Sequence, residues 1–191
     1  RVANPGCFAT AIQLALLPLA AAGILTNEVH INAITGSTGA GQKPTSTSHF
    51  SWRNNNLSIY KAFTHQHLIE INQTIKHLQP NFTQEINFLP LRGDFARGIF
   101  VSSYTECDLS AEELTALYKE FYKDAAFTFV MDANLDLKQV VNTNKAIVHV
   151  EKHGNKVLAI SAIDNLLKGA SGQAVQNFNL MFGLDETCGL K

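Results

Sequence analysis

The chain has 191 residues, of which 46% are hydrophobic, and 15 basic and 16 acidic side chains give it a formal net charge of -1. This balance excludes a strongly basic nucleic-acid-binding protein, and we expect neither a nucleic-acid nor a membrane partner. Its three cysteines, Cys7, Cys107 and Cys188, are widely spaced and form no C-x-x-C pair. We therefore expect a soluble globular domain from a reducing compartment rather than a disulfide framework or a zinc site.

The first motif is Asn4-Pro5-Gly6-Cys7, which precedes a long apolar run. Most residues from Phe8 to Ala22 favour a helix, whereas Pro5 and Gly6 do not fit a helix interior, so Cys7 should lie in or just before the first turn. Unpaired backbone N–H groups and the helix dipole would lower its thiol pKa toward neutrality and create a nucleophile. A buried, inert cysteine is the alternative.

A strand predicted from Glu28 to Thr35 leads into a glycine-rich loop over residues 36–43. Gly36 and Gly41 have P-loop spacing, but Gln42 occupies the position that requires lysine. No G-x-G-x-x-G dinucleotide fingerprint follows the strand. The loop is therefore either a flexible turn or a cradle of backbone N–H groups for an anion.

After a polar excursion from Pro44 to Ser58, a helix is predicted with Thr64 as its N-cap. His67 and Glu70 are three residues apart on this helix, so the carboxylate could orient the imidazole and raise its basicity for acid–base catalysis. An ordinary solvated helix face is the alternative. We expect no metal site, because His65 and His67 would diverge on a helix and H-E-x-x-H is absent.

The rest of the chain predicts a largely antiparallel sheet with two further helices. Two strand-like segments flank a turn that carries Arg92 and Arg97, and arginine suits bidentate capture of a carboxylate or phosphate. The expected elements are strands 84–91, 98–107 and 127–131, a helix 110–123 opened by a capping box, a hairpin formed by 146–152 and 156–163, and a helix 173–182.

Five motifs recur here in a recognisable order: Asn4-Pro5-Gly6-Cys7, the 36–41 loop, His65-Gln66-His67 with Glu70, Arg97-Gly98-Ile99, and the block from Ala162 to Asn177. Together they resemble the N-acetyl-gamma-glutamyl-phosphate reductase family of arginine biosynthesis. The resemblance implies that residues 1–191 are a catalytic and dimerisation domain, cut from a preceding NADP-binding Rossmann domain. The implied fold is α+β: a mixed, mostly antiparallel sheet covered by helices, similar to the C-terminal domain of glyceraldehyde-3-phosphate dehydrogenase.

The resemblance also implies a mechanism. A Cys7 thiolate would attack N-acyl-gamma-glutamyl phosphate, phosphate would leave, and NADPH would reduce the thioester to N-acyl-glutamate semialdehyde. His67 would carry protons and Glu70 would orient it. The implied substrate-binding residues are Thr35, Gly36, Ser37, Tyr60, His65 and Arg97. The implied residues on the nicotinamide side are Gly169, Gly172, Gln173 and Asn177.

Phe8, Gln66 and Leu68-Ile69 depart from the family's usual pattern, and these changes leave open an acetyl or a succinyl group on the substrate. The same class of chemistry includes aspartate-semialdehyde dehydrogenase, and a cysteine hydrolase is an alternative from another class. Without a dinucleotide fingerprint, the chain by itself should bind NADPH weakly or not at all and act as a dimerisation and substrate-binding module. The family implies a cytoplasmic homo-oligomer, a dimer or a tetramer.

Overall fold

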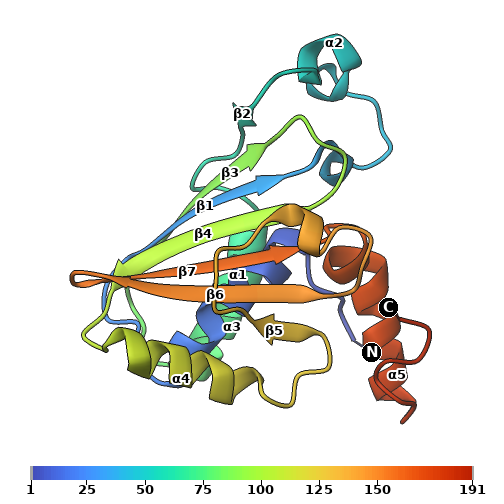
Figure 1. Ribbon diagram of the computed structural model, residues 1–191. Coiled ribbons are helices and arrows are strands. Elements are labelled where there is room, and N and C mark those ends of the chain that lie inside the picture. Colours follow the sequence, from blue (N-terminus) through green and yellow to red (C-terminus); the bar gives the residue numbers. More distant parts are fainter. Residues whose placement is uncertain (1, 191) are drawn as a thin grey trace.

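A seven-stranded sheet forms the centre of the protein in a computed structural model that describes residues 2–190 (Figure 1). Along the sheet the strands follow the order β2-β3-β1-β4-β7-β6-β5. The strands are β1 Val29–Thr35, β2 Ser58–Ile59, β3 Ile86–Arg92, β4 Ile99–Glu106, β5 Thr128–Val130, β6 Ala146–His153 and β7 Lys156–Ile163. The helices are α1 Cys7–Ala21, α2 Phe50–Arg53, α3 His67–Leu78, α4 Ala111–Tyr122 and α5 Gly172–Met181.

The sheet is mixed and mostly antiparallel, which confirms the predicted α+β class. The pairs β1/β3 and β5/β6 are parallel, whereas β1/β4, β2/β3, β4/β7 and β6/β7 are antiparallel. The predicted hairpin is present as β6 and β7, and Gly154 at its turn has a φ of 57°, a left-handed conformation that favours glycine. The capping box at Ser110 and Glu113 is also present at the start of α4.

Helix α1 occupies the core, packed between the sheet and the helices α3 and α4. It is apolar on nearly all sides, and a helix of that kind is stable in water only when it is buried. Three hydroxyl groups donate hydrogen bonds to its backbone carbonyls: Ser161 to Ala11, Tyr118 to Ala15 and Tyr122 to Leu14, each at 2.6 Å. These bonds fix α1 along its length, so its first turn is held in a defined place.

Two details differ from the sequence-based expectations. Helix α3 begins at His67 rather than after a Thr64 cap, because the His65 imidazole accepts the backbone N–H of His67 at 3.2 Å. The 44–58 excursion is an ordered arm rather than a simple loop. Buried Arg53 anchors this arm by donating to the carbonyls of Thr47, Asn56 and Arg92 and to the Ser58 hydroxyl.

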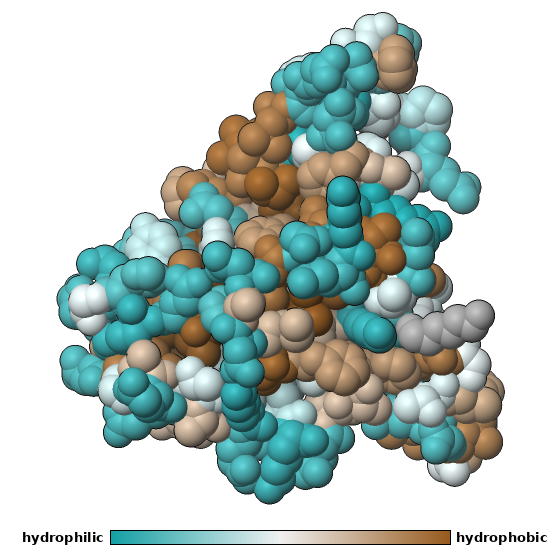
Figure 2. Space-filling model, in the orientation of Figure 1, coloured by the Kyte–Doolittle hydropathy of each residue, from teal (hydrophilic) through white to brown (hydrophobic). Residues whose placement is uncertain are grey.

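Exposed apolar side chains gather on α5 and just beyond it, at the lower right of Figure 2. They are Val175, Phe178, Leu180, Met181, Phe182 and Leu184. An apolar surface of this extent is typical of a contact surface between protein parts.

Candidate active site

A cavity of about 690 Å³ lies where the first turn of α1 meets the glycine-rich loop and the start of α3. Segments far apart in the sequence form its walls, including the ends of β1 and β3 and the segment after β7. Its lining residues are Asn4, Pro5, Gly6, Cys7, Phe8, Thr35, Thr38, Gly39, Ala40, Gly41, Thr45, Thr47, Tyr60, Lys61, His65, Gln66, His67, Arg92, Asn165, Leu166, Gly169 and Ala170.

Cys7 is the first residue of α1 and lines this cavity, as the sequence predicted. The predicted direction of its pKa shift is wrong, however. Burial raises the pKa of the Cys7 thiol, although the backbone N–H groups of Phe8 and Cys7 lower it in part. The desolvation of the anion therefore outweighs the N-terminal donors of the helix, which favours the thiol form over the thiolate.

His67 reaches the same place from α3. A Cβ atom added to Gly6 would lie 2.2 Å from Nε2 of His67, so the imidazole packs directly on the glycine backbone. Nε2 is therefore within about 4 Å of the Gly6 Cα, and within about 8 Å of the Cys7 Cα because consecutive Cα atoms are about 3.8 Å apart. The fold thus brings a thiol and an imidazole sixty residues apart into one cavity.

Glu70 makes no hydrogen bond to His67, so the prediction that its carboxylate orients the imidazole directly is wrong. Its Oε2 atom accepts the backbone N–H of Gly6 at 2.8 Å, and Nδ1 of His67 is buried without a hydrogen-bond partner among residues 2–190. Burial lowers the pKa of His67, and the Glu70 charge offsets this only in part. Glu70 therefore acts on the histidine through its charge and fixes the segment before Cys7.

His65 lies behind His67, with the two ring centroids 4.5 Å apart. Its ring is also in edge contact with Phe8, Tyr60 and Phe88. Burial is the main cause that lowers the pKa of His65 from 6.5 to about 4. Since Nδ1 of His65 accepts the His67 N–H, the neutral ring carries its proton on Nε2 and serves as a cap for α3.

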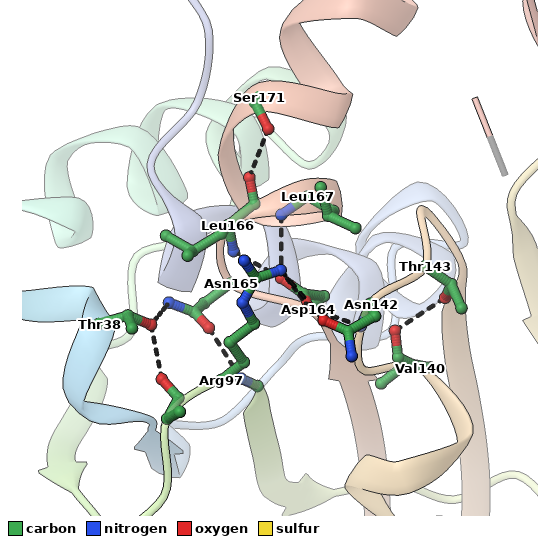
Figure 3. A network of polar contacts seen from close by, with 12 residues as sticks. Thr38, Arg97, Val140, Asn142, Thr143, Asp164, Asn165, Leu166, Leu167 and Ser171 are labelled. Carbon is green, nitrogen blue, oxygen red and sulfur yellow. Dashed lines mark hydrogen bonds and ion pairs between the residues drawn. The ribbon is translucent and has the colours of Figure 1, made fainter. Parts of the chain in front are cut away.

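The glycine-rich loop is ordered as a 3₁₀ turn over Ser37–Ala40. Asn165 joins this turn to the opposite wall, because its amide donates to the Thr38 hydroxyl at 3.0 Å and accepts the Gly98 N–H at 2.7 Å (Figure 3). The Thr38 hydroxyl in turn donates to the Ala96 carbonyl. This arrangement is a fixed wall rather than a flexible turn.

Asp164, beside Asn165, is fully buried and holds the segment that follows β7. Its carboxylate accepts the backbone N–H groups of Leu166, Leu167 and Asn142 at 2.8 to 3.0 Å (Figure 3). A π-helical turn over Leu167–Ser171 follows, and a Cβ atom at Gly169 in this turn would lie 2.8 Å from the Cys7 Cβ. The hydrogen bonds of Asp164 therefore hold the turn in which Gly169 packs closely against Cys7.

The predicted site residues fall into two groups in the structure. Cys7, Thr35, Tyr60, His65, His67 and Gly169 line the cavity. The residues outside its lining are Gly36, Ser37, Glu70, Arg97, Gly172, Gln173 and Asn177. Of these, Asn177 is close to the rim, since its amide donates to the side chain of Asn4 at 3.0 Å. Gly172 packs on Asn144 instead.

Arg97 is directed away from the cavity, toward Asp164 at 3.8 Å and the Asn142 side chain at 3.1 Å (Figure 3). The cationic residues on the lining are Arg92 and Lys61, which the sequence-based site assignment did not include. Arg92 carried a usable signal, because it directly follows the predicted strand 84–91 and precedes Gly93-Asp94. The sequence contained no comparable signal for Lys61.

Residues 2–190 contain neither a membrane-spanning helix nor a cluster of metal ligands. No helix there has the length and apolar character that would let it cross a membrane. No group of three or more His, Cys, Asp or Glu side chains in that part of the chain is arranged to hold a metal ion.

Solved structures of other proteins share this fold. It is similar to that of aspartate semialdehyde dehydrogenase II from Vibrio cholerae, with a TM-score of 0.72 over 95% of this chain and 62% of that one, at 16% sequence identity. A probable aspartate-semialdehyde dehydrogenase from Pseudomonas aeruginosa gives a TM-score of 0.71 at 14% identity, over 93% of this chain and 61% of that one. The semialdehyde dehydrogenase dimerisation-domain family matches residues 7–165, and the chain belongs to this family.

Much closer sequence relatives are named N-acetyl-gamma-glutamyl-phosphate reductase. The protein from Parabacteroides distasonis is 62% identical over 190 residues, which are 100% of this chain and 59% of that protein. The protein from Bacteroides thetaiotaomicron is 63% identical over 191 residues, again 100% of this chain and 59% of that protein. The protein from Flavobacterium johnsoniae is 64% identical over 189 residues, 99% of this chain and 58% of that protein. The chain thus spans less than two thirds of the length of these relatives.

Proposed function

We propose that this chain is the catalytic and dimerisation part of an NADPH-dependent N-acyl-gamma-glutamyl-phosphate reductase, which forms N-acyl-glutamate semialdehyde and phosphate in arginine biosynthesis. The observation that carries the proposal is the meeting of Cys7, at the head of α1, with His67 in one cavity. Relatives more than 60% identical carry the reductase name and are longer than this chain. We infer that the remaining part of the full-length protein is the Rossmann domain that binds NADP.

The cavity fits the nicotinamide end of that cofactor. Gly169 and Ala170 line the wall beside Cys7, and a Cβ atom at Gly169 would already collide with the Cys7 Cβ at 2.8 Å. Glycine and alanine carry at most a methyl group, so a flat ring could approach the backbone of this wall near Cys7. These residues would hold the nicotinamide, while Asn177 and Gln173 lie farther out. Bound NADPH supplies the hydride that reduces the captured acyl group.

The first chemical step is an acyl transfer to Cys7. The sulfur attacks the carbonyl carbon of the acyl phosphate, the bond from that carbon to the phosphate oxygen breaks, and inorganic phosphate leaves. Burial raises the pKa of Cys7 and lowers that of His67, so the resting pair is a neutral thiol and a neutral imidazole. Nε2 of His67 is then free to take the thiol proton as the bond forms. After reduction it would give a proton to the oxygen of the thiohemiacetal.

The remaining lining residues position the substrate. The side chains of Thr35 and Thr38 and the backbone of Gly39 border the cavity and would contact the substrate there. Tyr60 and His65 close the side next to α3. Capture of the acyl group as a thioester protects it from water until reduction, which is the purpose of a covalent step here.

The test of this proposal is the substitution Cys7→Ser in the full-length protein. We expect loss of phosphate-dependent turnover by at least about a thousandfold, because a serine hydroxyl near pH 7 is a far poorer nucleophile than a thiolate. Retention of most of the activity would refute the role of Cys7. Preference for aspartyl phosphate would identify the enzyme as an aspartate-semialdehyde dehydrogenase instead. Esterase or peptidase activity in this chain alone would favour a cysteine hydrolase.

We also propose that the chain by itself binds NADPH weakly or not at all, since it contains no G-x-G-x-x-G motif. Calorimetric titration of residues 1–191 with NADPH should show no micromolar affinity. The domain belongs to a dimerisation-domain family, and we propose that the full-length protein is a cytoplasmic homo-oligomer, a dimer or a tetramer. Sedimentation of the full-length protein tests the oligomer.

A further inference from the structure

The charged side chains that line the cavity beside Cys7 are positive. Lys61 and Arg92 line it, and its lining within residues 2–190 contains no aspartate or glutamate. Lys61 is exposed, and its ammonium group already donates to the Gln66 side chain at 2.9 Å. Arg92 is therefore the cation whose bonding capacity remains available to a ligand.

Arg92 is held firmly from both ends. Its backbone, at the end of β3, pairs with Thr35 on one side and Ser58 on the other, and its carbonyl accepts a hydrogen bond from Arg53 at 2.6 Å. Its guanidinium lies over the ring of Tyr60, with Cζ 4.5 Å from the ring centroid. This stacking fixes the plane of the guanidinium and adds a cation–π attraction.

The terminal nitrogens of Arg53 and Arg97 donate to oxygen acceptors, whereas the guanidinium of Arg92 meets the side chain of Tyr60. Arg53 donates to four oxygen atoms, and Arg97 donates to Asn142 and lies near Asp164. In both Arg53 and Arg92, Nε is buried without a hydrogen-bond partner in residues 2–190. No carboxylate of that part of the chain lies within 4.0 Å of the Arg92 guanidinium. An unpaired buried donor is costly, and such groups in native proteins are often completed by a ligand.

We propose that Arg92, oriented by Tyr60, is the substrate-binding residue that takes the α-carboxylate of the N-acyl-glutamyl substrate. The edge formed by Nε and one terminal nitrogen matches the two oxygens of a planar carboxylate. This assignment gives the anion-binding role to Arg92 instead of Arg97, and the identity of the substrate rests on the proposed function above. With its α-carboxylate bound there, the substrate would lie in the same cavity as Cys7, and its acyl phosphate would face the sulfur.

The first test does not depend on the proposed reaction. In the full-length protein, Cys7 is alkylated with iodoacetate, which carries a carboxylate, and with neutral iodoacetamide, and both rates are measured by mass spectrometry of the Cys7 peptide. Arg92→Gln should lower the iodoacetate-to-iodoacetamide rate ratio by about tenfold, the size expected for a charge-assisted hydrogen bond. Arg92→Lys keeps the positive charge but loses the paired N–H donors of the guanidinium, so it should give an intermediate ratio.

The matched control is Lys61→Gln, which removes the other lining cation. It should change the ratio by less than about threefold, since an exposed charge is well screened. An unchanged ratio in Arg92→Gln, or an equal fall in Lys61→Gln, would overturn the assignment. Thermal melting verifies that each variant is folded.

The second test separates the two anions of the substrate. In the reverse reaction, the full-length protein takes N-acyl-glutamate semialdehyde and inorganic phosphate as separate substrates. Arg92→Gln should raise the KM for the semialdehyde by about tenfold and leave the KM for phosphate unchanged. An analogue of the semialdehyde with an α-amide in place of the α-carboxylate should have the same KM in wild type and Arg92→Gln. A rise in the phosphate KM alone would contradict the proposal. If the wild-type protein oxidises no semialdehyde, the proposed function fails, and the alkylation ratio still decides the role of Arg92.

Discussion

The imidazole of His67 rests on the backbone of Gly6, so closely that a Cβ atom on this glycine would lie 2.2 Å from Nε2 and 2.5 Å from Cε1. Any side chain at position 6 must therefore displace the ring that the proposed mechanism uses as a base. This contact joins the residue before the proposed nucleophile to the residue proposed to accept its proton.

We expect Gly6→Ala to lower kcat by about a hundredfold or more, a typical effect when a catalytic group is misplaced by about 1 Å. The KM for the acyl phosphate should change much less, because the substrate-binding walls are elsewhere. Steady-state kinetics of the full-length protein test this prediction. Wild-type kcat in a folded Gly6→Ala variant would show that His67 does not need its present position.

The reactivity of Cys7 should depend steeply on pH. Burial raises the pKa of this thiol above its ordinary value, so the thiolate fraction near pH 7 is small and increases about tenfold per pH unit. We expect the rate of iodoacetamide alkylation at Cys7 to keep rising beyond pH 8.5. A plateau of the rate between pH 6 and 7 would mean that the N–H donors of α1 outweigh burial.

Glu70 has two separable roles, a charge near His67 and an acceptor for the Gly6 N–H. Glu70→Gln keeps an acceptor oxygen but removes the charge that raises the pKa of His67. That pKa should then fall further below its ordinary value, as NMR titration of the His67 ring can measure. Glu70→Ala removes both and should also lower the free energy of unfolding by about 1 kcal/mol. An unshifted His67 titration in Glu70→Gln would refute the charge effect.

His65 should make the protein sensitive to acid. Its pKa is about 4 in the folded chain, below its ordinary value of 6.5, so between these values the unfolded chain binds a proton that the folded chain does not. The stability contributed by the neutral ring is therefore complete above pH 6.5 and decreases as the pH falls toward 4.

Urea unfolding of wild type and His65→Asn at pH 7.0, 5.5 and 4.5 measures this contribution. The variant should lose less of its free energy of unfolding than wild type over this range, whatever its stability at pH 7. His77→Gln, at an exposed position on α3, is the control. Equal losses in wild type and His65→Asn would exclude His65 as the source.

Asp164 should be important for stability, because its buried carboxylate accepts three backbone N–H groups. Asp164→Ala leaves these donors and the Arg97 guanidinium without their partner, and we expect a loss of about 3 kcal/mol in the free energy of unfolding. Asp164→Asn should lose less, since one oxygen remains. Asp124→Ala, at an exposed position after α4, should have no measurable effect in the same urea titration. A loss below 1 kcal/mol in Asp164→Ala would show that these bonds are replaced by water.

The sequence by itself determined the local elements and placed the proposed nucleophile, Cys7, at the start of a helix. The apolar run after Gly6 could only be a buried helix, and the Pro-Gly pair before it placed Cys7 in the first turn. The capping box at Ser110 and the glycine turn between β6 and β7 were also readable, because each depends on residues a few positions apart. Such signals act over short distances, so a linear sequence contains them.

Only the tertiary structure decided which groups meet and what charge they carry. Spacing on a helix suggested that Glu70 bonds His67, yet the carboxylate bonds Gly6, which comes from another part of the chain. The N-terminal position of Cys7 suggested a low pKa, yet burial by neighbouring elements raises it. Likewise Arg97 faces Asp164 and Arg92 lines the cavity, although the two are only five residues apart in the sequence. Desolvation and pairing depend on atoms brought together from distant positions, and the packing of the whole chain sets them.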